Sequence, residues 1–167
     1  MRQRGAVAAL LVLAACDSGS PAAPAPLPTA GAGATLERAA IAAGVVRDPA
    51  TLDPAGAYGS DTDRLCVVAD GERYRVGASV DYGEGQACLA RGEGRGRERL
   101  RIDFGAGCTL EAMVDGERIA FPAAVPAACA QRCSGRATLS ALSADRLSGS
   151  ATEARSMRAS DGRPLCG

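Results

Sequence analysis

The stretch from residue 64 to residue 82, RLCVVADGERYRVGASVDY, decides the fold class of this chain of 167 residues. Apolar residues recur at every second position on both sides of the Asp-Gly pair at 70–71, which is the period of a β-strand buried on one face. An Asp-Gly pair between two such runs is typical of a tight antiparallel hairpin. With residues 70 and 71 as the turn, Val67 pairs with Tyr74 and the apolar side chains share one face.

The same pattern continues along the chain and predicts further strands. They are expected over residues 88–91, 99–104, 108–114, 117–121 and 136–142. A second Asp-Gly pair at 115–116 predicts another hairpin, in which Ala112 pairs with Ile119. The run Gly92-Glu93-Gly94-Arg95-Gly96 departs from the phosphate-binding pattern G-x-G-x-x-G at its third glycine, and no helix follows it, so it predicts a turn.

Tight turns connect these strands, and no strand alternates with a long helix. The sequence therefore predicts a mainly β fold, a small antiparallel β-barrel or sandwich of about six to eight strands with short helices packed on it. Thr35 is expected to cap a helix over 36–43 that ends before Gly44, with an apolar face suited to docking. Further short helices are predicted over 127–132 and, from a capping box at 150–153, to about residue 158.

The first 16 residues have the layout of a bacterial export signal. Arg2 and Arg4 precede an apolar run over 6–15, which is too short to span a bilayer because spanning takes about 20 residues. The run ends in Leu13-Ala14-Ala15-Cys16, and these four residues resemble the lipobox of bacterial lipoproteins. The resemblance implies that the Cys16 sulfur carries diacylglycerol, with palmitate-like acyl chains, and that the chain is cleaved before Cys16.

A lipoprotein of this kind is anchored in the bacterial cell envelope and faces the periplasm. In enterobacterial lipoproteins an Asp directly after the lipidated cysteine implies retention at the inner membrane, so Asp17 favours that membrane and leaves the outer membrane as the alternative. Two other interpretations of the segment stay open. One is an ordinary signal peptide with Cys16 in the disulfide framework, and the other is a buried helix of a cytosolic protein.

The chain divides by composition into four parts. They are a lipoprotein signal peptide (1–15), a lipid anchor with a disordered Pro/Ala/Gly-rich linker (16–34), a short helix with an irregular connection (35–63), and a disulfide-stabilised β domain (64–167).

Composition excludes several kinds of chemistry. The chain has no His, which excludes Ser-His-Asp and Cys-His nucleophiles and removes the commonest nitrogen ligand of zinc. Without residues 1–15, 17 arginines stand against 19 acids, and this balance gives no reason to expect a nucleic-acid partner. We expect no metal and no cofactor. An enzyme would depend on carboxylates alone, with Glu72, Asp81 or Glu117 as candidates.

Six cysteines remain beyond Cys16: Cys66, Cys88, Cys108, Cys129, Cys133 and Cys166. An even number in an exported chain predicts three disulfides, and the alternative, a thiolate metal site, lacks any C-x-x-C pair. We expect Cys66 to pair with Cys88, and Cys108 to pair with either Cys129 or Cys133, which leaves the other for Cys166. Fifteen connectivities are possible, so the number of disulfides is the firmer prediction.

Alternating arginines mark one candidate binding face. Five arginines between residues 91 and 101 outnumber the two glutamates among them, and Arg97, Arg99 and Arg101 form the proposed face. The alternatives are an ordinary solvated strand face and a contact for an anionic envelope partner, such as lipid headgroups or a glycan. The expected function is a non-enzymatic, membrane-anchored binding module.

Two other functions stay open. One is an accessory subunit of an envelope assembly, with an envelope protein as partner. The other is inhibition of a periplasmic hydrolase, because the layout is similar in architecture to the lysozyme-inhibitor type of lipoprotein, although the signature loop of that family is missing.

Overall fold

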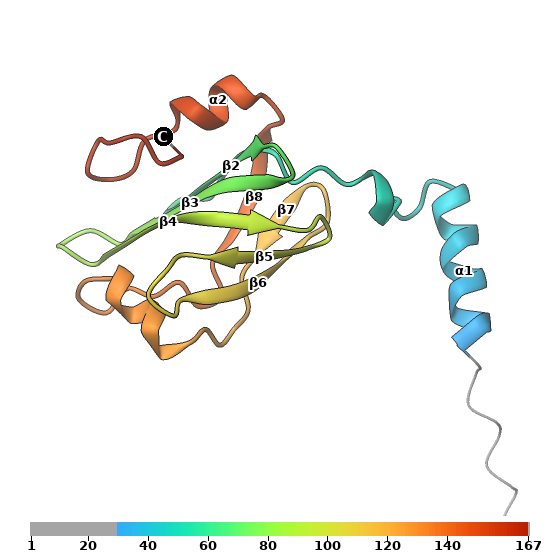
Figure 1. Ribbon diagram of the computed structural model, residues 1–167, viewed down its shortest axis with the longest axis horizontal. Helices are drawn as coiled ribbons and strands as arrows, with labels where there is room; N and C mark the ends of the chain where they lie inside the picture. The colour runs from blue at the N-terminus through green and yellow to red at the C-terminus, as the bar shows by residue number, and fades with distance from the viewer. Residues whose placement is uncertain (1–29, 167) are drawn as a thin grey trace, which may run out of the picture.

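Eight antiparallel strands close into one barrel in the computed structural model, which describes residues 30–166 (Figure 1). The strands follow one another around the barrel in chain order, and the last strand pairs with the first. They are β1 (Gly56–Gly59), β2 (Asp63–Asp70), β3 (Arg73–Asp81), β4 (Ala87–Arg95), β5 (Arg99–Asp103), β6 (Thr109–Val114), β7 (Arg118–Ala120) and β8 (Ser143–Ser148). The expected mainly β fold is confirmed, in its barrel form.

The first hairpin forms where it was predicted, but with a different register. Val67 pairs with Val76 rather than with Tyr74, and Asp70 pairs with Arg73. The turn therefore consists of residues 71 and 72, and Gly71 adopts a φ of 62°, which glycine reaches without strain. Because the register differs by two residues, the same side chains still point inward.

The second hairpin differs from its predicted register by the same amount. Val114, rather than Ala112, pairs with Ile119. Asp115 lies in the turn, and its Oδ1 accepts hydrogen bonds from the backbone N–H groups of Glu117 and Arg118. Four residues, 115–118, therefore lie between the paired residues Val114 and Ile119, two more than in the predicted two-residue turn.

The glycine-rich run at 92–96 is not a turn as predicted, because β4 continues through residue 95. A Cβ at Gly92 would lie 2.0 Å from the carbonyl oxygen of Asp103, and one at Gly94 would lie 2.9 Å from Cγ2 of Val76. The glycines thus allow close packing around β4 instead of ending the strand. Only Gly96, with a φ of 99°, starts the turn to β5.

Two strands escaped the sequence pattern, and one predicted strand is wrong. The barrel begins at β1, inside the segment 35–63 that was expected to be irregular. The predicted strand over 136–142 is a series of turns that places Leu139 and Leu142 in the core, and the strand follows as β8. Among the residues of β8 only Ala144 is buried, so that strand has no clear apolar alternation.

The N-terminal helix α1 (Ala30–Ala42) begins inside the segment that was expected to be a disordered linker. Thr35 does not cap it, because this residue lies within the helix and its hydroxyl donates to the carbonyl oxygen of Gly31 at 2.8 Å. Leu36 is 73% exposed, so the expected docking face is not covered by the barrel. Figure 1 shows the helix standing apart from the sheet. Gly44 follows its end with a φ of 70°, as expected.

Apolar side chains fill the inside of the barrel. The largest of them that are almost completely buried come from strands all around the barrel: Tyr58, Leu65, Leu100, Ile102 and Ile119. Leu65, Leu100, Ile102 and Ile119 belong to the inward-facing set that alternation predicted for β2, β5 and β7. Tyr58 lies on β1, the strand that was not predicted. A densely filled interior leaves the outer face and the strand ends as the surfaces on which this protein can bind a partner.

Arg146 on β8 joins the two strands that close the barrel. Its guanidinium lies 4.9 Å from the ring centre of Tyr58 on β1 and donates to the carbonyl oxygens of Asp53, Ala55 and Gly116 at 2.6, 2.9 and 2.6 Å. The Tyr58 hydroxyl donates to the carbonyl oxygen of Pro54 at 2.8 Å. These contacts fix the chain before β1 to β8 and to the turn after β6.

The C-terminal segment covers part of the outer face of the barrel. Helix α2 (Ala151–Ser156) begins as predicted, with the Ser150 hydroxyl accepting from the Glu153 backbone N–H at 3.4 Å. Beyond it, Leu165 packs against β3 at Gly77, where a Cβ would lie 2.3 Å from the Leu165 carbonyl oxygen. A second, smaller apolar cluster thus forms on the outside of β1 and β2.

Three disulfides hold the chain, as expected in number. They join Cys66 to Cys166, Cys88 to Cys133, and Cys108 to Cys129. Cys129 lies in the 3-10 helix η2 (Ala127–Arg132), and Cys133 is the residue that caps its C-terminal end. Cys129 bonds to Cys108 just before β6, and Cys133 bonds to Cys88 on β4. The predicted Cys66–Cys88 bond is wrong because Cys66 belongs to the outer cluster, whereas Cys88 points into the core.

Removing the Cys66–Cys166 disulfide should destabilise the protein most, because it closes a loop of 100 residues. The variant Cys66→Ala/Cys166→Ala should lose about 4–5 kcal/mol of unfolding free energy on the chain-entropy account. The matched control Cys108→Ala/Cys129→Ala opens a loop of 21 residues and should lose about 3 kcal/mol. Urea denaturation measures both losses, and an equal or smaller loss for the first variant would contradict this order.

Stability should also fall in strong base because of Tyr58. Burial raises the pKa of Tyr58 to about 12, against the opposing effect of the Arg146 guanidinium. Between about pH 10 and pH 12 the phenol ionises in the unfolded chain but not in the folded one, so the unfolding free energy falls by up to about 1.4 kcal/mol per pH unit. Urea denaturation from pH 8 to pH 11 should show a flatter profile for Tyr58→Phe than for the control Tyr82→Phe, whose ring is exposed. Equal slopes would contradict the assignment.

Candidate functional site

The outer face of β4 and β5 brings two arginines directly opposite each other. Arg95 and Arg101 are cross-strand partners in the antiparallel ladder, and both side chains are exposed. Beside them lies a surface hollow of about 330 Å³, lined by Arg73, Glu93, Arg95, Arg101 and Asp103. We call these five residues the arginine hollow.

Both acids of the arginine hollow accept hydrogen bonds from groups other than Arg95 and Arg101. Glu93 pairs with Arg73 at 2.6 Å, and Asp103 accepts from the backbone N–H of Gly105 at 2.8 Å. Neither Arg95 nor Arg101 forms an ion pair with any residue in 30–166. Two like charges directly opposite each other destabilise a sheet. The ten N–H donors of two guanidinium groups instead suit an anion with several oxygens, such as a phosphate or a carboxylate.

Of the three arginines that were predicted to form a binding face, only Arg101 belongs to the arginine hollow. Arg99 on β5 forms an ion pair with Glu111 on the neighbouring strand β6, at 2.9 Å. Arg97 donates to the carbonyl oxygen of Leu52 at 3.1 Å and lines a different hollow. The three residues therefore do not form one common face, although Arg99 and Arg101 both point outward from β5, as alternation predicted.

Arg73 and Arg95 were missing from the predicted face. Alternation marks Arg73 as an outward residue of its predicted strand, whereas Arg95 lies in the run 92–96 that was predicted to be a turn, so the sequence carried only part of the signal. It did not contain the pairing of β4 with β5, which places Arg95 opposite Arg101. Arg91, at the start of the same arginine series, is taken up by the C-terminal segment, since it donates to the Pro164 carbonyl oxygen at 3.1 and 2.9 Å.

The carboxylates proposed for an enzymatic alternative do not meet. Glu72 lies in the β2–β3 turn, Asp81 at the end of β3, and Glu117 in the β6–β7 turn, and each lines a different hollow. Glu117 also forms an ion pair with Arg47. These residues thus do not form a common acid–base pair within the part of the chain that the structure describes.

The remaining predicted site residues are accounted for separately. Cys16, the predicted lipidation site, lies outside the described residues. The six other cysteines are paired in disulfides. Between residues 30 and 166 no group of three or more Cys, Asp or Glu side chains is placed to hold a metal ion, and no helix there is long and apolar enough to cross a membrane.

No protein-family model, no curated protein and no solved structure matches this chain. The site must be judged on its own residues. Its distinguishing property is the pair of opposed arginines, neither of which forms an ion pair with a described residue although Arg101 also lies opposite Glu111 on β6, on a face that the C-terminal segment leaves uncovered.

Replacing one of the opposed arginines with an acid should stabilise the protein. In Arg95→Glu the new carboxylate faces Arg101. A cross-strand pair of opposite charge stabilises a sheet by roughly 0.2–1 kcal/mol, whereas the like-charge pair that it replaces destabilises the sheet. Urea denaturation at low salt should show this gain, and 1 M NaCl should reduce it. Arg136→Glu, at an exposed site away from the hollow, serves as the control. A loss of stability in Arg95→Glu alone would show that Arg95 contributes to folding.

Proposed function

We propose that this protein is a non-enzymatic, membrane-anchored binding module of the bacterial cell envelope, and that it recognises an anionic group through the arginine hollow. The observation that carries the proposal is the cross-strand pairing of Arg95 with Arg101, without a counter-ion within residues 30–166. An anion seated between the two guanidinium groups would remove their repulsion and accept several charge-assisted hydrogen bonds.

Electrostatics favours an oxyanion over a neutral partner at this place. Three arginines and two acids line the arginine hollow, so its net charge is +1, and the Arg73–Glu93 ion pair leaves Arg95 and Arg101 against the single charge of Asp103. All five residues that line the arginine hollow are charged, so a charged group at the end of a larger molecule fits it better than an apolar ligand does. Acidic lipid headgroups and acidic envelope glycans are the partners that carry such groups at a membrane surface.

Anchoring through Cys16 supports this function by raising the local concentration of the partner. A protein with two or three acyl chains stays on the membrane, whereas a single chain binds only reversibly. A weak affinity of the arginine hollow for its partner then suffices, because the anchor holds the protein at the same membrane surface as the partner and so raises the effective concentration of the partner.

Crosslinking in intact cells tests the proposal. A photoreactive residue at Thr109, which pairs with Asp103 beside the hollow, should capture the partner. Arg95→Gln/Arg101→Gln should reduce the crosslinked product at least tenfold, because each lost charge-assisted hydrogen bond costs about 1.5–3 kcal/mol. The control Arg136→Gln should not change it.

The identity of the captured molecule separates the candidate functions. A lipid or glycan supports the proposed surface binder. One stoichiometric envelope protein would favour an accessory subunit, and a hydrolase would favour inhibition. Crosslinks that the double variant leaves unchanged would contradict the arginine hollow as the site. As a separate arm, Cys16→Ser should abolish acyl labelling and membrane retention, and normal processing of that variant would contradict the anchor.

A further inference from the structure

Helix α1 and the residues just after it expose an unusual share of large apolar side chains. Leu36 is 73% exposed, and Val45 and Val46, beyond the end of the helix, are 78% and 47% exposed. The other exposed large apolar side chains within residues 30–166 are scattered over the barrel: Tyr82, Met113 and Leu147. Scattered apolar residues are normal on a surface, whereas a cluster of them marks a place that another molecule covers.

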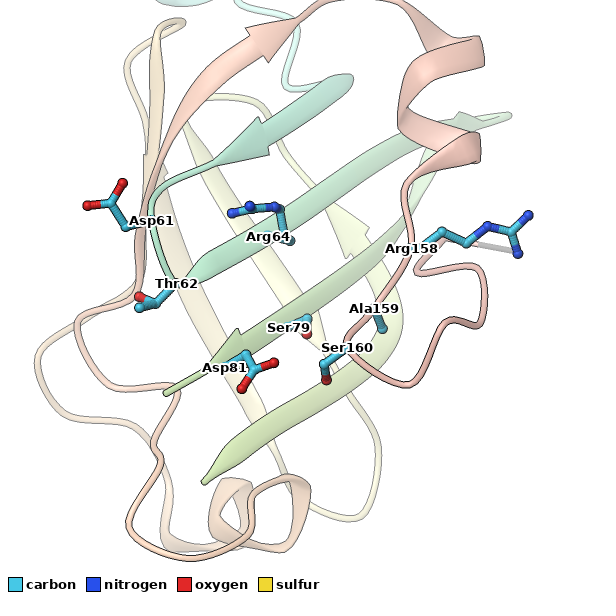
Figure 2. Close-up of a pocket in the computed structure, with 8 residues that line it drawn as sticks. All are labelled: Asp61, Thr62, Arg64, Ser79, Asp81, Arg158, Ala159 and Ser160. Carbon is cyan, nitrogen blue, oxygen red and sulfur yellow. The ribbon is translucent and has the colours of Figure 1, made fainter. Parts of the chain in front are cut away.

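The barrel covers helix α2 and the C-terminal segment, but it leaves α1 open. Ala154 of α2 is completely buried, and Ala159 and Leu165 beyond it belong to the same outer cluster. Figure 2 shows Ala159 and Ser160 beside Ser79 of β3. In contrast, none of residues 31–47 whose burial the structure describes is buried. The molecule that covers α1 is therefore not the barrel of its own chain.

A hydrogen-bonded cap ties the two valines to the helix. The backbone N–H of Gly44 donates to the carbonyl oxygen of Ile41, and that of Val45 donates to the carbonyl oxygen of Ala40, both at 2.9 Å. These are the two bonds of a Schellman cap. Along the helix, one face is apolar with the spacing i, i+3, i+4 and i+7: Leu36, Ala39, Ala40 and Ala43. Leu36 and the valines thus belong to one short apolar unit, residues 36–46.

This apolar unit needs a partner, and a second copy of the chain is a poor one. A helix of 13 residues is marginal by itself in water, and Gly31 and Gly33 weaken it further. The helix is about 20 Å long and about 10 Å wide, so it can bury only about 200 Å² on a partner helix. A stable dimer buries about 800 Å² on each partner.

A lipid surface requires only one apolar face, and the anchor proposed above places such a surface within reach. Ala30 follows Cys16 by 14 positions, so the start of α1 stays within about 50 Å of a lipid-modified Cys16. The bilayer is then present at a high effective concentration. We propose that α1 lies on the membrane surface, with Leu36, Val45 and Val46 inserted at the boundary of headgroups and acyl chains. This inference rests on the proposed anchor at Cys16 and is independent of the arginine hollow.

Fluorescence quenching in reconstituted vesicles tests the proposal. The chain has no Trp, so Leu36→Trp supplies a single reporter on the helix, and Leu147→Trp, at a 63% exposed site on β8, supplies the control on the barrel. The lipidated protein is reconstituted into phosphatidylcholine vesicles whose acyl chains carry bromine. Bromine should reduce the emission of Leu36→Trp about twofold, because an interfacial helix buries its apolar face about 5–10 Å deep. The emission of Leu147→Trp should not change.

Two double variants, both made in the Leu36→Trp protein, test the role of the valines. Val45→Ser/Val46→Ser should lose about half of the quenching, because less apolar area enters the lipid. The matched control Met113→Ser/Leu147→Ser removes two exposed apolar side chains from the barrel and should keep the quenching. The Tm should be the same with and without Val45→Ser/Val46→Ser, because neither valine belongs to an apolar cluster of the barrel.

Mass spectrometry of the purified protein separates failure of this inference from failure of the anchor. A lipidated protein in which Leu36→Trp is not quenched would overturn this inference alone, and a chain without lipid at Cys16 would overturn both. Full quenching in Val45→Ser/Val46→Ser would also overturn it. So would a blue shift of Leu36→Trp emission that grows with protein concentration without lipid, because a second copy would then cover the helix. Arg95→Gln/Arg101→Gln should leave the quenching unchanged.

Discussion

The contact of Arg146 with Tyr58 is the interaction on which barrel closure depends. β1 has four residues and β8 has a single buried one, so these two strands have little apolar area with which to find each other. The guanidinium supplies what the strands lack, because it stacks on the buried ring and donates to three backbone carbonyls from two segments, the chain before β1 and the β6–β7 turn. Closure removes the two sheet edges that would otherwise be open to pairing with other chains.

The C-terminal segment then determines which parts of the outer face are available. Gly77 allows it to lie directly on β3, and the Cys66–Cys166 disulfide holds it there. It binds Arg91 through the Pro164 carbonyl and leaves Arg95 and Arg101 uncovered. Its passage over β3 also buries Ser79. One short segment thus determines which outward residues of β3 and β4 stay exposed.

The arginine hollow keeps an arrangement that costs stability, because two arginines lie directly opposite each other. Local departures from the most stable arrangement are more often found at functional sites than elsewhere. This property, rather than size or depth, distinguishes the arginine hollow from the hollow around Arg47 and Asp53, whose lining includes Arg146, the residue that closes the barrel.

Period-two alternation in the sequence was enough to determine the mainly β fold and the inward-facing residues of β2, β5 and β6, and the even number of cysteines was enough to predict the number of disulfides. Alternation says which face a residue occupies, but not which residue lies opposite it on another strand. The Arg95–Arg101 pair, the partner of Cys66 100 residues away, and the strands β1 and β8 were therefore decided only by the tertiary structure, because each depends on contacts between segments that are distant or carry no pattern of their own.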